Sequence, residues 1–531
     1  MKKNIYILLM VLILALSFGV RLWRVDKSPD SVNWDEAALG YNAYSLLKTG
    51  RDEFGKVLPV SLRSFDDYKP ALYSYLSVPP VALFGLSETS TRLTSVISGV
   101  ILVFLALYLT VKLTGSFKTG LAAAVFLSLS PWAMHFSRIA FEANLASSLY
   151  YLGIGAFILG LKEKRFFYAS FILMIISMYA YHAQRAVALP TFVLLWILFR
   201  PVRLNRAELT KLGLILGLGL LPLIVSFVTE PAGSRLTATN VLKLWPFVPK
   251  EFSQIVYSPI YTMIWQLAGQ FMAYFSPASL FVRGSVEPIL RIPTLGLFGY
   301  ELLPLLITGL LVFFKSKQFL KVAIAVLLLA PLPGVVTWNW FSVVRTVAVY
   351  PMLTMIMAIG ASYLVGLLKP YKMIKAAVIV AFCGIFAISS WYTFLTVTIF
   401  APWDNFGDFQ PGFEQSVPTI ISLSQNKEKV IFDSPHIAPY IFVLFYSRYS
   451  PQQYLDEAGL NRKNSGTEDY AFGKFTFRKI SQEDWKIKNA ILVGPTARIP
   501  DYAAEQMQRD GAKVVDFFDV KGYTSFRVVD L

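Results

Sequence analysis

Two adjacent carboxylates, Asp35 and Glu36, stand in the segment SVNWDEAALG, shortly after the N-terminal apolar run. Asn33 precedes Glu36 by three positions, which is a capping-box pattern, so we expect Glu36 to serve at the start of a helix. Asp35 is then left for chemistry, because an aspartate is ionised at neutral pH and can accept a proton from an incoming hydroxyl group. The alternative is that both acids only complement the positive end of the helix dipole.

Three cations, Lys69, Arg138 and Arg185, lie in three separate segments, DDYKPALYSYL, HFSRIAFEANL and YAYHAQRAVALP. Taken singly, each could be an anchor at the membrane surface, because long basic side chains commonly reach from an apolar segment to the interface. Taken together they could bind a phosphate group, since ammonium and guanidinium donors form charge-assisted hydrogen bonds to phosphoryl oxygens. The three segments must meet for this hypothesis to hold.

Further ionisable residues fall at the same ends of the apolar runs. The supporting set is Glu36, Asp67, Glu142, His182 and Arg345, and Glu301 lies a few residues inside the end of its run. The interiors of the runs are nearly free of charge, whereas transporters and ion pumps usually carry ionisable residues near the middle of the membrane. We therefore expect the chemistry at the outer membrane surface.

A divalent metal ion is the open point of this site. Asp35, Glu36 and Asp67 could hold a hard cation through their oxygens. The alternative, which we favour, is that Glu36 caps the helix, Asp67 pairs with Lys69, and no metal or other cofactor is required. The three histidines show no recognisable ligand spacing, and the lone Cys383 excludes an intrachain disulfide and a thiolate metal site.

The elements that must position these residues are membrane spans. The chain has 531 residues, of which 55% are hydrophobic and 15% charged, far from the composition of a soluble domain. The N-terminal run lacks a small-residue cleavage site, so we read it as a retained span. Eleven apolar runs are candidate spans: 5–23, 93–113, 119–136, 143–161, 166–183, 186–200, 212–229, 294–314, 320–338, 346–368 and 376–399.

Basic clusters give the orientation. They fall in every second loop, which predicts eleven spans with a cytoplasmic N-terminus and explains the net charge of +16 without nucleic acid. The clusters begin at Lys2, Lys112, Lys162, Arg200, Lys315 and Lys369. Three large segments then lie outside: 24–92, 230–293 and 401–531.

Each outer segment has its own pattern. Ala37, Tyr41 and Tyr44 recur at helical spacing and predict a helix lying along the interface in 24–92. The segment 230–293 is rich in aromatics and prolines, so it either covers the site or forms an interfacial aromatic belt. The tail 401–531 contains strand-like stretches, KVIFDS, KFTFRKI, NAILVG, AKVVDFFDV and TSFRVVDL, with helix-like pieces at 436–448 and 501–510. We expect a small exported α/β domain.

These residues resemble a known group, the membrane glycosyltransferases that use polyprenyl-phosphate sugars and have the GT-C fold. Protein O-mannosyltransferases and the bacterial aminoarabinose transferase of lipid A are members. The resemblance rests on WDEA after the first span, YKPALY in the same loop, HFSRIAFEANL, and YHAQR at the end of the fifth span. It runs from the first span to roughly the tenth. The order and shared outer placement of the motifs carry it, and the tail lies outside it.

The resemblance implies a mainly α, polytopic fold and an inverting displacement at the anomeric carbon of a sugar on a polyprenyl monophosphate. Asp35 matches the aspartate proposed as general base in the family, and Lys69 matches the lysine near the leaving phosphate. Arg138 and Arg185 match arginines that approach the donor. The acceptor is reached from the outer side and is a protein, a lipid or a glycan.

Two other classes of protein fit part of the pattern. A flippase or transporter of lipid carriers would also have outer basic residues, but it should show a polar path through the membrane. A receptor or assembly scaffold would use the tail as its working part and the spans only as an anchor.

Overall fold

The computed structural model describes residues 2–65, 67–201, 204–229, 259–337, 340–401, 409–433, 438–458, 469–518, 522 and 524–531. Two compact units make up the chain: residues 1–23 and 95–397, which we call the helical unit, and residues 24–94 and 398–531, which we call the mixed unit. Asp66, His436 and the stretch 230–258 of the aromatic segment 230–293 lie outside the described residues.

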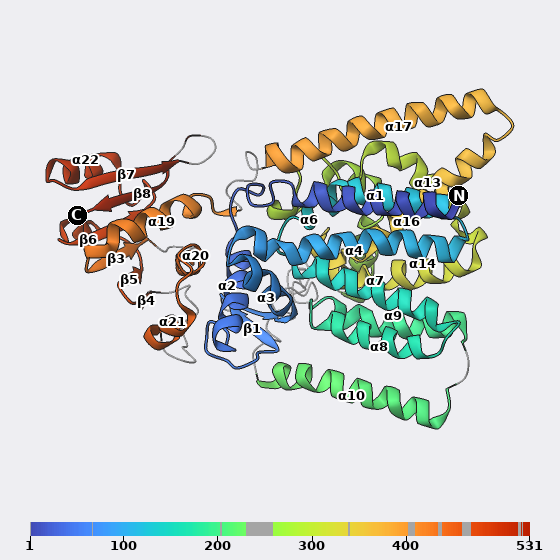
Figure 1. Cartoon of the computed structure of the whole chain (residues 1–531), viewed down its shortest axis with the longest axis horizontal. Helices are drawn as coiled ribbons and strands as arrows, with labels where there is room; N and C mark the ends of the chain where they lie inside the picture. The colour runs from blue at the N-terminus through green and yellow to red at the C-terminus, as the bar shows by residue number, and fades with distance from the viewer. Residues whose placement is uncertain are drawn as a thin grey trace. The chain divides into compact units, whose positions relative to one another are not determined.

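Helices form most of the helical unit (Figure 1). Its long helices are α1 (Lys2–Leu22), α4 (Glu88–Thr114, whose first turns belong to the mixed unit), α7 (Glu142–Gly160), α10 (Arg206–Thr229), α16 (Val349–Leu367) and α17 (Lys372–Leu395). The shorter ones are α5 (Phe117–Leu129), α6 (Pro131–Phe136), α8 (Arg165–Met178), α9 (Gln184–Phe199), α12 (Pro259–Ala273), α13 (Leu303–Val312), α14 (Lys317–Leu329) and α15 (Leu332–Val335).

Seven helical stretches of the described chain are long and apolar enough to cross a membrane. They are Asn4–Leu22, Glu88–Thr114, Glu142–Gly160, Arg206–Thr229, Lys317–Val335, Val349–Leu367 and Lys372–Phe400, and each overlaps a predicted run. The other four predicted runs form shorter helices, namely α5 with α6, α8, α9 and α13. Two of these are shortened where Pro131 and Pro304 stand in the first turn of α6 and α13, since proline starts a helix readily but cannot continue one.

Small residues let two of these helices approach closely. α13 and α16 pack against each other at Gly309 and Gly360, where any side chain would collide with the backbone of the opposite helix. Polar bonds join α4 to α7, because the Asn144 amide donates to the Ser95 carbonyl at 2.9 Å and the Ser148 hydroxyl to the Ser98 carbonyl at 2.7 Å. Close backbones and interhelical hydrogen bonds are the means by which helices associate in lipid.

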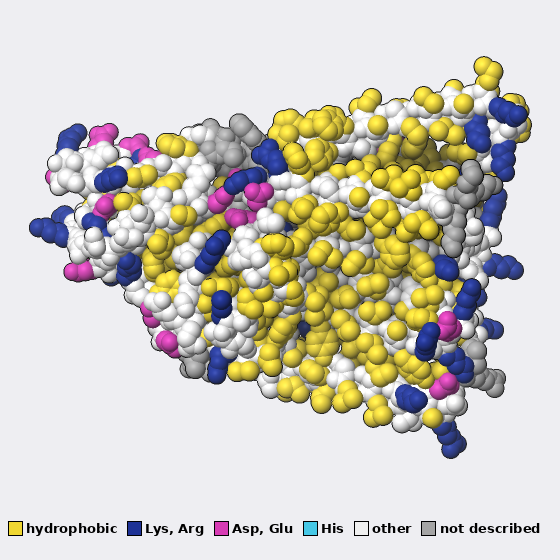
Figure 2. Space-filling view, viewed as in Figure 1, with side chains coloured by type: hydrophobic (Ala, Val, Ile, Leu, Met, Phe, Trp, Pro, Cys, Tyr) yellow, Lys and Arg dark blue, Asp and Glu magenta, His cyan; other side chains and the backbone are white. Residues whose placement is uncertain are grey.

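The surface of the helical unit has the pattern of a membrane protein. Hydrophobic side chains cover its flank, and Lys and Arg side chains gather at the end where the N-terminus lies in Figure 1 (Figure 2). α1, α10 and α17 expose apolar residues along their length, for example Leu12, Leu218 and Val380. Apolar exposure on this scale is stable only against lipid. The protein is therefore a multi-pass membrane protein, as the apolar runs predicted.

The mixed unit combines the loop after α1 with the tail of the chain. The loop folds into α2 (Trp34–Thr49), a hairpin of β1 (Ser61–Ser64) and β2 (Asp67–Pro70), and α3 (Leu72–Phe84). The tail contains α19 (Phe413–Leu423), β3 (Lys429–Phe432), α20 (Pro439–Tyr446), α21 (Pro451–Ala458), β4 (Tyr470–Phe472), β5 (Phe475–Phe477), β6 (Ala490–Gly494), α22 (Asp501–Arg509), β7 (Lys513–Phe518) and β8 (Thr524–Asp530). All five strands predicted from the sequence are confirmed, as are the two helical pieces.

The tail strands form one sheet in the order β4-β5-β3-β6-β8-β7. β5, β3 and β6 run parallel, and β4, β8 and β7 are antiparallel to their neighbours. Successive residues of β3 point to opposite faces of the sheet and belong to two hydrophobic cores. Val430 packs on the face covered by α19 and α20, and Ile431 packs on the face covered by α22. The tail is therefore an α/β domain with helices on both faces of its sheet, as predicted.

The loop shares its core with the tail. Ala37 and Tyr41 of α2 belong to the same hydrophobic cluster as Ile441 and Phe445 of α20. A side chain at Gly40 would meet the Phe445 ring at 2.7 Å, so α20 lies directly on α2. The helix predicted from the spacing of Ala37 and Tyr41 is confirmed as α2. Most of its residues are buried by other parts of the protein.

Candidate functional site

Asp35 and Lys69 form an ion pair within the mixed unit. Asp35 lies in the first turn of α2, and Lys69 lies on β2, opposite Leu62 of β1. The Lys69 ammonium donates a hydrogen bond to Oδ1 of Asp35. The Lys69 side chain is only 7% exposed, whereas that of Asp35 is 40% exposed. A buried cation thus holds a carboxylate that solvent can reach.

Glu36 closes the capping box that the sequence predicted. Its backbone N–H donates to Oδ1 of Asn33 at 2.9 Å, and its Oε2 accepts from the Asn33 N–H at 3.2 Å. This satisfies two of the donors that a helix start leaves without a partner. Glu36 is fully buried, and its carboxylate serves the structure of the turn that carries Asp35.

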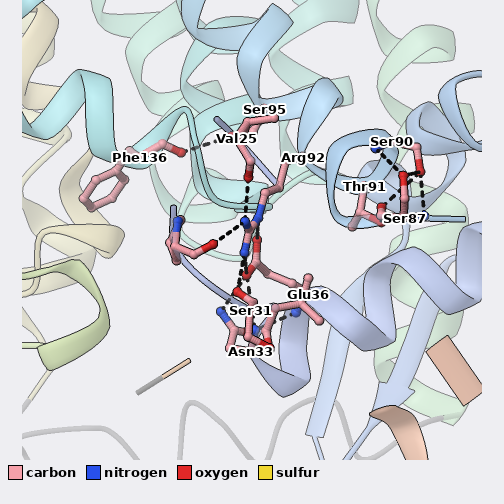
Figure 3. A network of polar contacts seen from close by, with 12 residues as sticks. Val25, Ser31, Asn33, Glu36, Ser87, Ser90, Thr91, Arg92, Ser95 and Phe136 are labelled. Atoms are coloured by element: carbon pink, nitrogen blue, oxygen red, sulfur yellow. Dashed lines mark hydrogen bonds and ion pairs between the residues drawn. The ribbon is translucent and has the colours of Figure 1, made fainter. Parts of the chain in front are cut away.

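Arg92 is one residue that the sequence analysis missed. Its Nε and Nη2 donate to Oε1 and Oε2 of Glu36 at 2.9 and 3.0 Å, which is a bidentate pair with both side chains fully buried (Figure 3). Its Nη1 donates to the carbonyls of Val25 and Pro29 at 2.7 and 2.9 Å, and its Nη2 also donates to that of Ser31. Arg92 thus ties the segment after α1 to the start of α2. An arginine directly before the second apolar run, in TSTRLTSV, was the available signal.

Asp67, the third predicted acid of this loop, accepts a hydrogen bond from the backbone N–H of Tyr68 at 2.8 Å. Lys69 takes Asp35 as its ion-pair partner, in place of the expected pairing with Asp67. Among the described residues no group of three or more His, Cys, Asp or Glu side chains is arranged to hold a metal ion. That the protein requires no divalent metal ion therefore stays a prediction.

Arg138 lies in the helical unit and closes the end of α1. Its Nη1 donates to the carbonyls of Val20, Arg21 and Trp23 at 3.2, 3.0 and 2.6 Å, and the residue is fully buried. A guanidinium at this position satisfies carbonyls that the last turn leaves open and complements the negative end of the helix dipole.

Arg21 is a second buried arginine beside Arg138. Its Nη1 donates to the Ser17 hydroxyl at 2.8 Å and to the Ser128 carbonyl at 3.0 Å. Gly99 of α4 lies against the Arg21 side chain, because a Cβ atom at this position would be 2.9 Å from Nε of Arg21. The sequence showed Arg21 only as a flank of the first span, so its burial was not foreseen.

The remaining predicted residues belong to the helical unit and lie near helix ends. Arg185 is in the first turn of α9, and its Nε donates to the Met178 carbonyl at 3.4 Å. Glu142 opens α7, Glu301 lies in a short 3-10 turn (Tyr300–Leu302), and Arg345 lies in another (Val344–Thr346). His182 precedes α9. The meeting of these residues with Asp35 and Lys69 around one phosphate stays a prediction.

Comparisons with known proteins place the chain by fold. No family model and no curated protein matches the sequence. The chain is similar to the crystal structure of ArnT from Cupriavidus metallidurans in the apo state, with a TM-score of 0.52 and 13% identity over 100% of this chain and 98% of that one. It is similar to ArnT bound to undecaprenyl phosphate, with a TM-score of 0.51 and 15% identity over 98% and 97%.

A third similar structure is the oligosaccharyltransferase AglB from Archaeoglobus fulgidus, in complex with an inhibitory peptide and a dolichol-phosphate. Its TM-score is 0.51 and its identity 12%, over 94% of this chain and 71% of that one. At these identities the similarity shows the fold, which is the GT-C fold of polytopic membrane proteins. The fold expected from the order of the motifs is confirmed.

Proposed function

We propose that this protein is a glycosyltransferase that moves a sugar from a polyprenyl-phosphate carrier to an acceptor on the outer side of the membrane. The observation that carries the proposal is the pair of Asp35 and Lys69, a reachable carboxylate against a buried ammonium. The fold supports it, since similar structures hold undecaprenyl phosphate and dolichol-phosphate.

The reaction is a displacement with inversion. An acceptor hydroxyl oxygen attacks the anomeric carbon, the bond from that carbon to the phosphate oxygen breaks, and the phosphate leaves with the electron pair. Asp35 accepts the proton of the acceptor hydroxyl. Because an aspartate is only weakly basic, orientation of the acceptor supplies much of the acceleration.

Lys69 serves the leaving group. An ammonium has three N–H donors, so Lys69 can keep its bond to Asp35 while it donates to a phosphoryl oxygen. The charge that develops on the phosphate is stabilised more strongly by a buried cation than by water, and losing one such donor typically costs about 10²–10³ in rate. Arg138 and Arg185 are the further donor-binding candidates, and their role rests on the family resemblance alone.

The proposed topology has a cytoplasmic N-terminus and an extracytoplasmic tail, because the basic clusters lie in alternate loops. We propose that no divalent cation is required. Mass spectrometry of products formed by purified protein from defined polyprenyl-phosphate sugars, with and without a chelator, tests both points of chemistry. Transfer that persists in the chelator is expected. Movement of intact carrier across vesicles without release of sugar would overturn the proposal in favour of a flippase.

A further inference from the structure

The turn that carries Asp35 is completed by a residue from the tail. Trp34 is the first residue of α2, and its backbone N–H donates to Oε1 of Gln410 at 3.0 Å across 376 positions of sequence. The N–H of Glu36 is taken by the local cap Asn33. Asp35 therefore sits between two backbone donors with fixed partners, one local and one from the tail.

Gln410 is held in place by its neighbours. Its backbone has φ +40°, a left-handed conformation that is strained for a residue other than glycine. Such a conformation persists only where the surroundings impose it. Phe413, three residues on, supplies an anchor, because its ring stacks on Phe442 with centroids 4.3 Å apart and meets Phe526 at 4.5 Å.

A second tail residue holds the segment just before the turn. The hydroxyl of Tyr446 lies 3.0 Å from that of Ser31 and accepts the backbone N–H of Val32 at 3.4 Å. Burial raises the pKa of Tyr446 well above its ordinary value, which favours the protonated hydroxyl further. The two contacts fix the approach of the chain to the helix start.

The tail also contacts the hairpin that carries Lys69. Phe65 lies at the hairpin turn, and its ring stacks on Trp34 with centroids 5.4 Å apart. The same ring meets Tyr440 of α20 edge-on at 6.1 Å. Tail residues therefore touch the elements of both members of the Asp35 and Lys69 pair.

We propose that Gln410 and Tyr446 are positioning residues for Asp35, and that the tail completes the catalytic turn of the first outer loop. This inference rests on the proposed function, in which Asp35 is the base. It differs from the scaffold hypothesis, because the tail acts here through the geometry of a carboxylate that it does not itself contain.

The experiment compares Gln410→Ala, Gln410→Glu and Tyr446→Phe in the full-length protein, with Gln506→Ala as control. Glutamate keeps an oxygen acceptor for the Trp34 N–H. The side chain of Gln506 is exposed and, within the described residues, donates to Asp510 at the end of its own helix, α22. We expect Gln410→Ala to lower kcat by about 10–100-fold with an unchanged KM for the donor, because a misplaced catalytic group costs rate rather than affinity. Gln410→Glu should restore most of the rate, and the control should match wild type.

Amide hydrogen exchange over residues 31–40 reads the same link without any activity. We expect faster exchange at Trp34 in Gln410→Ala and at Val32 in Tyr446→Phe. If Gln410→Ala does not fold, Tyr446→Phe, which keeps the ring, carries the test. Unchanged kcat and unchanged exchange would overturn the inference, as would a fall in kcat that Gln410→Glu does not rescue. Altered exchange in a protein that transfers no sugar would instead overturn the proposed function and keep the structural link.

Discussion

Arg92→Met tests whether the buried pair of Arg92 and Glu36 stabilises the turn that carries Asp35. The substitution leaves a fully buried carboxylate without its cation and the carbonyls of Val25, Pro29 and Ser31 without their donor. Breaking a buried ion pair from one side typically costs about 3–5 kcal/mol. For a unit of roughly 200 residues, 1 kcal/mol corresponds to about 2–4 °C, so the unfolding midpoint should fall by about 6–20 °C.

The assay is the midpoint of thermal unfolding in detergent, followed by intrinsic fluorescence at one fixed scan rate because unfolding of a membrane protein is often irreversible. Arg509→Met is the matched control, since its pair with Glu505 is mostly exposed and should be worth less than about 1 kcal/mol. The double variant Glu36→Met with Arg92→Met should regain part of the loss, because no charge is then left buried alone. Equal midpoints for Arg92→Met and Arg509→Met would refute the reasoning.

Three further predictions concern the site, acid stability and the membrane. Asp35→Asn should leave the protein folded and inserted, because asparagine keeps an oxygen acceptor for Lys69, but it should abolish sugar transfer. Lys69→Ala should lower kcat by about 10²–10³. Both rates are measured by product formation, and normal turnover by Asp35→Asn would remove the proposed base. The hydrogen bond from Arg478 lowers the pKa of Asp484 from 3.8 to about 2. The ionised Asp484 therefore stabilises the fold fully above about pH 4, and this stabilisation is lost as the pH falls toward 2. Asp484→Asn should begin to unfold at a higher pH than wild type in an acid titration, and an identical titration would contradict this. α3 buries Ser74 and Ser77 but leaves Leu83 76% exposed, and Leu83 lies only a few residues before α4. We therefore expect the face of α3 that carries Leu83 to touch lipid. A fluorophore on Leu83→Cys, in a Cys383→Ser background, should be quenched by spin-labelled lipid, whereas a fluorophore on the exposed Leu58→Cys should not.

Local patterns in the sequence predicted the elements well. Every apolar run contains a helix, because a helix satisfies the backbone of an apolar segment within the segment itself. The capping box at Asn33 could also be predicted, because its two partners are only three residues apart in the sequence. α3 was missed because Pro79 and Pro80 interrupt its pattern, although a helix in a membrane protein tolerates them.

Contacts between distant segments could not be predicted. The bidentate pair of Arg92 and Glu36 spans 56 positions, and the bond from Trp34 to Gln410 spans 376. The residues that flank these four in the sequence do not indicate which distant residue each one contacts. The spacing of Ala37 and Tyr41 gave a helix but not the α20 that covers it. The sequence could therefore name Asp35 and Lys69 as candidates, but it could not show what holds them in place.

The common core of the loop and the tail has a consequence for biosynthesis. The loop leaves the ribosome early, yet the residues that bury Ala37 and Tyr41 include α20, near the end of the chain. At about 5–20 residues per second, the roughly 400 residues between Tyr41 and Ile441 take roughly 20–80 s to make. The half-formed loop must therefore persist through insertion of nearly all the spans, and a polypeptide truncated before Pro439 would reach the membrane without α20, which buries Ala37 and Tyr41 of α2.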